Sequence, residues 1–161
     1  MALTTVDKAR VKQAGNTIIA FGPKFTTLTA PSLAALTTDV TCVVLSLNDG
    51  TNASTIETQD LCDKDAKTSL DKRVRNLSMR LRVSKAGWAT LKPLLAEDAE
   101  VGVAVRRFDP TTTPLAVSDK VDAYNAKVLT CEFNEIATGN EYEIAVEFSD
   151  VYRERDAALL A

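Results

Sequence analysis

EYEIAVEFS, residues 141–149, is the stretch that decides the fold class, because its large apolar side chains occupy even positions and its glutamates odd ones. A period of two is typical of a β-strand with one buried face, whereas a helix would distribute the glutamates around its surface. The preceding NAKVLTCEF, residues 125–133, is also strand-like, and ATGN, residues 137–140, supplies the glycine and asparagine of a tight turn. The sequence therefore predicts a long antiparallel hairpin over residues 124–150.

The two faces of strand 141–149 are expected to meet different surroundings. The side chains predicted to face the core are Tyr142, Ile144, Val146 and Phe148. The carboxylates predicted to point away from it are Glu141, Glu143 and Glu147. Three carboxylates on one strand face require solvent, cations or a neighbour that they are meant to repel.

A second alternating stretch, residues 73–83, supplies a possible partner for these glutamates. Its predicted core side chains are Leu77, Met79, Leu81 and Val83. Arg80 and Arg82 lie on the other face of the same strand. If this strand lies beside the hairpin, its arginines can pair with the glutamates across strands, each pair contributing roughly 0.2 to 1 kcal/mol. Otherwise the acidic face stays free, and the sequence leaves both arrangements open.

Length and composition are typical of a soluble globular protein. With 161 residues, 45% hydrophobic and 25% charged, we expect a single domain over residues 1–161. A net charge of -3 and a pI near 5.1 argue against a dedicated nucleic-acid binder, which usually carries a basic patch. The N-terminus does not resemble a secretory signal, and the longest apolar runs, around 18–21 and 40–47, are too short to span a bilayer. We expect no membrane association.

The residue types exclude most enzyme designs. The chain has no histidine, so it lacks the usual general base, the usual partner of a nucleophilic serine or cysteine, and the commonest transition-metal ligand. Its six glycines are dispersed, and no phosphate-binding glycine loop can be written. Paired carboxylates could serve a glycosidase, but the chain is small for a carbohydrate cleft and has one tryptophan. The sequence predicts a protein that is not an enzyme and needs no cofactor.

Neither the acidic residues nor the cysteines indicate a metal site. Asp60, Asp63 and Asp65 superficially resemble ligands of a hard cation, but the spacing lacks the glycine and terminal glutamate of an EF-hand, and Lys64 and Lys67 intrude. Three widely separated cysteines indicate neither a disulfide framework nor a CxxC site. They are Cys42, Cys62 and Cys131, and we expect reduced thiols, with the first and last packed as small hydrophobic residues on strands.

The first third of the chain is predicted to hold two strands. Residues 17–21 form the first, ended by Gly22-Pro23 because proline cannot donate to a central ladder. Residues 31–36 fit one helical turn with proline in its first position. Residues 40–47 fit a buried strand, closed by the turn-forming Asn48-Asp49-Gly50.

One helix is predicted late in the chain. Ser84 can cap its N-terminus, and Trp88, Leu91 and Leu95 fall on one helical face as core anchors. Pro93 removes an amide donor and should kink or divide the helix. Adding a strand at 101–108 gives six or seven strands without helix alternation. This order predicts a mainly β fold of two packed antiparallel β-sheets, sandwich-like or barrel-like, with one flanking α-helix.

Three further segments are predicted to lie outside the sheets. Residues 48–72 are polar and rich in Thr, Asp, Lys and Ser, with one strand-like island, and fit a long polar loop. A loop of this length is uncommon in a compact domain unless it has a function, so solvated-loop and assembly-loop interpretations both stay open. Residues 1–14 are interpreted as an N-terminal arm and 151–161 as a C-terminal arm, whose apolar end should dock on this chain or on a neighbour.

The order of these features resembles the tail tube proteins, or major tail proteins, of long-tailed, non-contractile bacteriophages. The features are the strands, the long polar loop with Ile56-Glu57-Thr58-Gln59-Asp60, the helix with Gly87-Trp88, and the acidic hairpin closing on Phe148-Ser149-Asp150. The resemblance covers about residues 15–150. It implies two packed β-sheets with a flanking helix, in subunits that form hexameric rings stacked into a tube that conducts DNA during ejection.

The resemblance also implies roles for particular residues. The long loop would contact the adjacent ring, through Thr55, Ile56, Glu57, Thr58, Asp60 and Leu61. An acidic lumen would repel DNA phosphates and let the genome slide, and its candidate residues are Glu132, Glu141, Glu143 and Glu147. Expected partners are other copies of the chain, tape measure and tail terminator proteins, and DNA passing without specific binding. The implied location is the virion tail, assembled in the host bacterial cytoplasm.

Two other functions remain open from the sequence. A tail terminator or head-tail connector would also be a small β protein with one helix, but would stop at a single ring. A monomeric β-sandwich binding module would show an exposed aromatic platform, whereas the few aromatic residues here fall mostly on apolar strand faces.

Overall fold

The fold was analysed in a computed structural model that describes residues 3–7, 17–58, 67–107, 114–135 and 140–161. Within these residues the chain forms eight strands, one α-helix and one 3-10 turn. The strands are β1 Thr4–Thr5, β2 Ile18–Pro23, β3 Thr38–Asp39, β4 Val44–Thr58, β5 Lys67–Ser84, β6 Glu100–Arg106, β7 Lys120–Glu135 and β8 Glu141–Ala158. The helix is α1 Lys85–Leu91, and the 3-10 turn is Leu33–Ala35.

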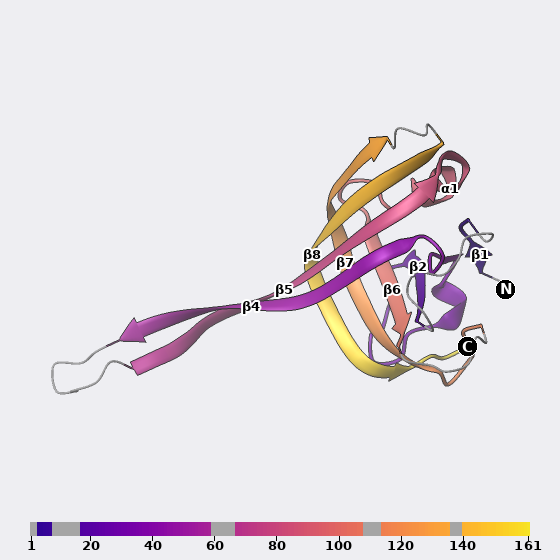
Figure 1. Cartoon of the computed structure of the whole chain (residues 1–161). Helices are drawn as coiled ribbons and strands as arrows, with labels where there is room; N and C mark the ends of the chain where they lie inside the picture. Colours follow the sequence, from indigo (N-terminus) through magenta and orange to yellow (C-terminus); the bar gives the residue numbers. More distant parts are fainter. Residues whose placement is uncertain (1–2, 8–16, 59–66, 108–113, 136–139) are drawn as a thin grey trace.

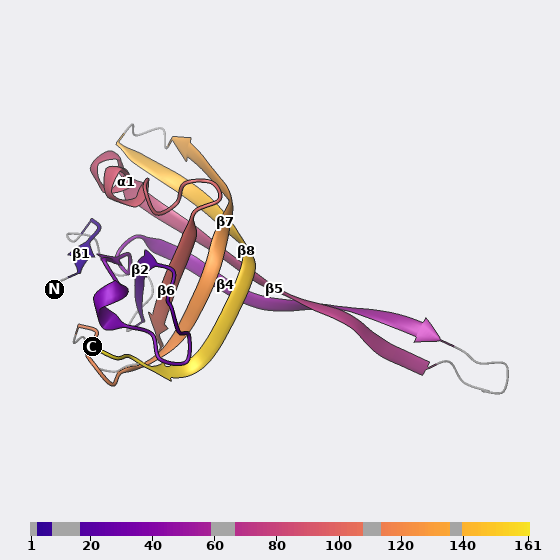
Figure 2. The ribbon, with the colours of Figure 1, turned by 180° about the vertical axis from the view of Figure 1, so that it is seen from behind.

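The strands form one sheet in the order β1-β3-β2-β6-β7-β8-β5-β4. Every pairing is antiparallel except β1 with β3. Figures 1 and 2 show the sheet strongly curved, with β7 and β8 bending around the interior and α1 at one end. The predicted mainly β class with one flanking helix is confirmed, and the two predicted sheets are continuous parts of a single sheet.

The main core fills the concave side of this sheet. It contains the alternating side chains predicted from the hairpin and from β5, including the fully buried Leu81, Val83 and Ile144. Tyr142, at the start of β8, is partly buried and packs against the same cluster. Burial of one face of each strand is the physical reason for the period of two in the sequence.

A second, smaller core lies on the other side of β2, β6 and β7. Ile18, Ala20 and Ala104 pack there against Leu36 and Leu159. The covering chain passes so close that a Cβ on Gly22 would lie 2.1 Å from the Ala35 carbonyl oxygen, and one on Gly102 would lie 2.5 Å from the Pro23 carbonyl oxygen. These strands are therefore buried on both faces, and two positions tolerate no side chain.

Helix α1 begins where the sequence predicts but is shorter than predicted, because Leu95 lies beyond its end. The Ser84 hydroxyl accepts a hydrogen bond from the Gly87 amide at 3.0 Å, which is the predicted N-cap. The helix ends at Leu91, just before Pro93. Trp88 is partly buried against the main core, and Leu91 and Leu95 are buried in it.

The predicted polar loop over residues 48–72 is wrong for its described part. Residues 48–58 belong to β4 and 67–72 to β5, and β4 runs through Asn48-Asp49-Gly50 without the predicted turn. These strands project from the body as a two-stranded ribbon (Figures 1 and 2). A ribbon exposed on both faces has polar side chains on both, so the alternation that reveals a half-buried strand is missing.

The C-terminal arm is also wrong as predicted, because β8 continues to Ala158 and pairs with the start of β7. Leu159 is buried, and the Leu160 amide donates to the Pro31 carbonyl oxygen, so this end docks on its own chain. At the other end, β1 pairs with β3 and Val6 is buried, so the described part of the predicted N-terminal arm belongs to the fold. Residues 1–2 and 8–14 lie outside the described residues.

Candidate functional site

The most exposed element is the hairpin extension, which comprises β4 residues 48–58 and β5 residues 67–76. β8 pairs with β5 only over residues 77–84, so the extension has two strands and no third. The outer edge of β4 has no strand partner among the described residues. An isolated two-stranded ribbon is marginally stable in water, and an open edge is a template for another chain.

The open edge of β4 lacks the residues that usually discourage such pairing. Between residues 44 and 58 there is no lysine, arginine or proline. Leu70 and Val74 on β5 are about half exposed, at 49% and 47%, and the register places them on opposite faces of the ribbon. The extension therefore offers both backbone groups and apolar side chains to a neighbour.

The predicted contact residues fall only partly within the described chain. Thr55, Ile56, Glu57 and Thr58 form the end of β4, with Thr55 exposed. Asp60 and Leu61 lie outside the described residues, as do the cation-ligand candidates Asp60, Asp63 and Asp65.

The glutamate-rich face of β8 is partly neutralised. Arg80 forms an ion pair with Glu143, and the Arg82 Nε lies 2.7 Å from Glu141 Oε2. The cross-strand pairing that the sequence left open is thus formed. Both arginine side chains remain well exposed, so these pairs are worth at most about 1 kcal/mol each in water.

The carboxylates of the other two acidic candidates, Glu132 and Glu147, are not neutralised by a described cation. Both are exposed, and neither forms an ion pair within the part of the chain that the structure describes. In the β7–β8 register Glu132 lies opposite Ala145 and Glu147 opposite Thr130, so both project from the convex face. The unpaired negative charge on this face therefore lies at Glu132 of β7 and at Glu147 of β8, which is opposite Ser78 of β5.

A buried ion network anchors the base of the hairpin extension. The Asp49 side chain is only 5% exposed and accepts two hydrogen bonds of 2.9 Å from Arg153 Nη1. It also accepts a 2.8 Å hydrogen bond from the Tyr124 hydroxyl, and Arg155 Nη2 lies 3.6 Å from it. The network thereby connects β4 to β7 and β8, which are not its neighbours in the sheet.

The same network continues to a second buried carboxylate. Arg107 donates from Nη2 to the Tyr124 hydroxyl at 3.3 Å and from Nε to Asp122 at 3.0 Å. Burial raises the pKa of Tyr124 to about 12, and its hydrogen bond to Asp49 acts in the same direction, because the neutral phenol is the form that can donate. Tyr124 is therefore a neutral donor at physiological pH.

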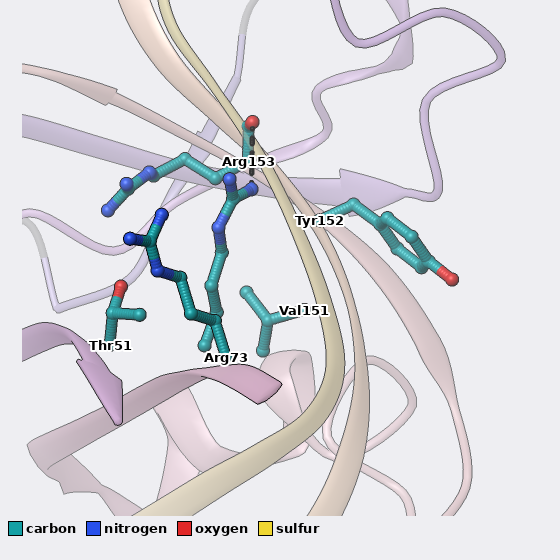
Figure 3. Close-up of a pocket in the computed structure, with 6 residues that line it drawn as sticks. Thr51, Arg73, Val151, Tyr152 and Arg153 are labelled. Carbon is teal, nitrogen blue, oxygen red and sulfur yellow. Dashed lines mark hydrogen bonds between the residues drawn. The ribbon is translucent and has the colours of Figure 1, made fainter. Parts of the chain in front are cut away.

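An open cleft of about 690 Å³ lies where β5 and β8 separate. We call it the arginine cleft; its lining residues are Thr51, Arg73, Arg75, Val151, Tyr152 and Arg153. Arg75 Nη1 donates across the gap to the Arg153 carbonyl oxygen at 3.3 Å. In Figure 3, Arg73 and Arg153 share one side of β8 with Thr51, while the Tyr152 ring points to the other side.

The sequence interpretation did not find the arginine cleft, although a signal was present. Arg73 and Arg75 form an R-x-R pair, and Arg153 and Arg155 form another. Such spacing puts two guanidinium groups on one face of a strand. What was missing was the placement of β5 relative to β8, which brings Arg153 of the second pair to the same cleft as Arg73 and Arg75.

The chemistry of the described residues supplies no metal centre. They contain no group of three or more Cys, Asp or Glu side chains placed to hold a metal ion. Cys42 is buried and Cys131 partly buried, both outside any disulfide, and Cys62 lies outside the described residues. Cys131 is on β7 as predicted, whereas Cys42 lies in the turn before β4. No described helix has the length and apolar character required to cross a bilayer.

Comparison with known proteins gives one match to a family. The sequence model of a family described as phage tail tube protein matches residues 5–151. No curated protein matches the sequence.

Solved structures include distant matches. One is a chain from the tail of an empty GTA particle, determined by helical refinement with C6 symmetry; it is 13% identical, with a TM-score of 0.49, and the match covers 90% of this chain and 98% of the other. Another is from the sheath/tube terminator of the extracellular contractile injection system PVC in its extended state, at 12% identity and a TM-score of 0.45, covering 86% and 92%.

Proposed function

This chain belongs to the phage tail tube proteins, and from this membership we propose that its copies close into rings that stack into the tube of a long-tailed, non-contractile phage. A member of this family is a structural component of the phage tail and not an enzyme. We propose further that the rings are hexameric, that the subunits assemble in the host bacterial cytoplasm, and that the tube conducts DNA during ejection.

The observation that carries this proposal is the hairpin extension. Its strands leave the body of the sheet, and their outer edge and both faces are exposed in the isolated chain. A protein that stayed monomeric would keep an open strand edge without the lysines or prolines that natural proteins place there. A neighbouring copy would supply the missing strand contacts and cover Leu70 and Val74.

The position of the extension also suits an open-ended polymer. It projects on one side of the body, whereas β1 and the C-terminus lie on the other (Figures 1 and 2). A contact between two different surfaces is head-to-tail, and it yields a ring when the rotation closes and an open stack when it does not. Tape measure and tail terminator proteins are proposed as the partners that set the length and end of such a stack.

Deletion of residues 55–65 tests this function. The variant removes the end of β4 and the segment that follows, but none of the core residues identified in the described part of the chain. We expect folded subunits with an unchanged β circular dichroism spectrum that no longer form tubes in negative-stain electron microscopy, where wild-type protein does. Tubes from the deletion variant would show that the extension does not join rings.

The same micrographs separate the alternatives. A tail terminator or connector would give single rings from the wild-type protein, and a monomeric binding module would give no visible assembly. Either result at high protein concentration and near-native ionic strength would contradict the proposed polymer.

A further inference from the structure

We propose that the arginine cleft is the receptor for the acidic segment 57–65 of the hairpin extension of a second copy. The inference rests on the proposed function, because it specifies which surfaces join when subunits stack. The argument has three parts: the open backbone of the cleft, its charge, and its position at the base of the extension.

The cleft exists because two paired strands part. β5 and β8 are hydrogen-bonded up to Leu77 and Phe148; beyond these residues β5 pairs only with β4, and β8 only with β7. Asp150, with a φ of 51°, marks the point where β8 turns away. The two strand edges that face the fork therefore have no strand partner among the described residues. An extended polypeptide can use such edges, whereas a nucleic acid backbone has no amide donors to pair with them.

The charge of the fork selects an acidic occupant. Arg73 and Arg75 are exposed, and neither forms an ion pair among the described residues. Arg153 shares Asp49 with Arg155, and Arg107 binds Asp122. Of the three arginines that line the cleft, only Arg153 is ion-paired among the described residues, so Arg73 and Arg75 leave an excess of two positive charges there.

Segment 57–65 has the complementary composition. Its sequence, ETQDLCDKD, carries four carboxylates and one lysine, an excess of three negative charges. Some other acidic residues are already engaged: Asp98 pairs with Lys127, and Glu100 pairs with Lys24. Glu141 and Glu143 pair with the arginines of β5, as described above.

A chain cannot place this segment in its own cleft. Thr58 and Lys67, the last described pair of the ribbon, lie seven and six residues beyond Thr51 and Arg73. At about 3.3 Å per residue, that is roughly 20 Å or more along a ribbon that points away from the body. The occupant must come from a second copy. Because the two contact surfaces differ, the contact is head-to-tail, and it gives an open stack when its rotation does not close.

Charge reversal at the cleft is the first test. Arg73→Glu with Arg75→Glu, the cleft variant, changes exposed residues only, and we expect an unchanged melting temperature with loss of sedimentable tubes. Lys72→Glu is the matched control, because Lys72 is exposed on the opposite face of the same strand; it should keep its tubes. If the double variant is unstable, Arg73→Glu alone provides the test, because Arg73 makes no hydrogen bond or ion pair among the described residues.

The decisive test mixes the cleft variant with a second variant whose charges are reversed in segment 57–65. A tip variant, Asp60→Lys, Asp63→Lys and Asp65→Lys, should also fail to form tubes by itself. An equimolar mixture of the tip and cleft variants should regain tubes, because each acidic segment then meets a basic cleft and each basic segment an acidic one. Failure of the mixture to assemble, when each variant is folded, would overturn the inference.

The outcomes of these experiments distinguish failure of the proposed tube function from failure of the proposed cleft contact. Absence of tubes from the wild-type protein would overturn the proposed function and this inference with it. Tubes from the cleft variant would overturn the inference alone.

A labelled 20-base-pair DNA duplex, followed by fluorescence anisotropy, tests nucleic acid as the competing ligand of the cleft. We expect equal anisotropy of the duplex with the wild type and with the cleft variant. Loss of duplex binding in a cleft variant that still forms tubes would assign the cleft to nucleic acid instead.

Discussion

Asp49 shows at the scale of one residue how the hairpin extension is fixed to the body. Its carboxylate is buried and accepts hydrogen bonds from Arg153 and Tyr124, which come from two strands that β4 does not neighbour. A buried carboxylate without such partners would be strongly unfavourable. The direction of the ribbon where it leaves the body is therefore set by a charge pair and not by apolar packing alone.

The Tyr124 hydroxyl makes this network sensitive to alkaline pH. Its pKa is raised from 10.0 to about 12, so the folded state holds the phenolic proton more tightly than the unfolded state. The resulting stability is complete below pH 10 and is lost as pH rises from 10 through 12, by about 1.4 kcal/mol for each pH unit in that window.

Tyr124→Phe tests this linkage. The free energy of unfolding should be higher for wild type than for the variant at pH 8, and the difference should shrink between pH 10 and 11.5 in denaturant titrations. Tyr152→Phe, which removes an exposed hydroxyl outside the network, is the control for pH effects on the rest of the molecule. A wild-type advantage that stays constant to pH 11.5 would contradict the assigned role of the hydroxyl.

At the scale of elements, the hairpin extension and the rest of β5 differ in how many strands they pair with and in how deeply they are buried. Residues 77–84 lie between β4 and β8 and have a buried face, whereas residues 67–76 pair with β4 alone and are exposed where their side chains are described. Local opening of a two-stranded ribbon costs little compared with opening of a core strand.

Hydrogen exchange should show this difference directly. Amides of residues 48–58 and 67–76 should exchange much faster than those of 77–84 in the monomer, and should become protected in assembled tubes. Mass spectrometry of peptides from the two states gives the measurement. Full protection of the ribbon in the monomer would mean that it needs no neighbour.

At the scale of the whole molecule, the question is which surface faces the passage of the proposed tube. We propose that the convex β7–β8 face does so, with Glu132 and Glu147 as its unpaired charges and Glu141 and Glu143 contributing less because arginines accompany them. Free carboxylates repel phosphate, and a basic lining would bind DNA by releasing counterions.

Glu132→Lys with Glu147→Lys should slow genome ejection from otherwise normal particles, as followed by the release of fluorescently stained DNA. The paired variant Glu141→Gln with Glu143→Gln should have a smaller effect on ejection, since it removes charges that Arg82 and Arg80 already compensate. An unchanged ejection rate in the lysine variant, with tubes intact, would place this face outside the passage.

The sequence pattern predicted strands and their buried side chains correctly where one face of a strand is buried and the other is exposed. Ile144, Val146 and Phe148 lie in the core as their alternation indicates, and Ser84 caps α1 as its position indicates. The predicted loop was wrong for residues 48–58, which form a strand that is largely exposed where its side chains are described. The predicted arm was wrong for residues 151–158, where charged residues continue β8. In neither segment do side chains alternate between core and water in a way that local pattern can detect.

The sequence by itself therefore determined the class of the fold, the positions of the hairpin and helix, and the lack of histidine-based chemistry, because these depend on composition and on neighbours within a few residues. Only the tertiary structure decided that Arg80 and Arg82 neutralise two glutamates, that Asp49 anchors the ribbon, and that Arg73, Arg75 and Arg153 line one cleft. Each of these joins residues dozens of positions apart. Their meeting depends on strand order and register, which the alternation within any one strand does not specify.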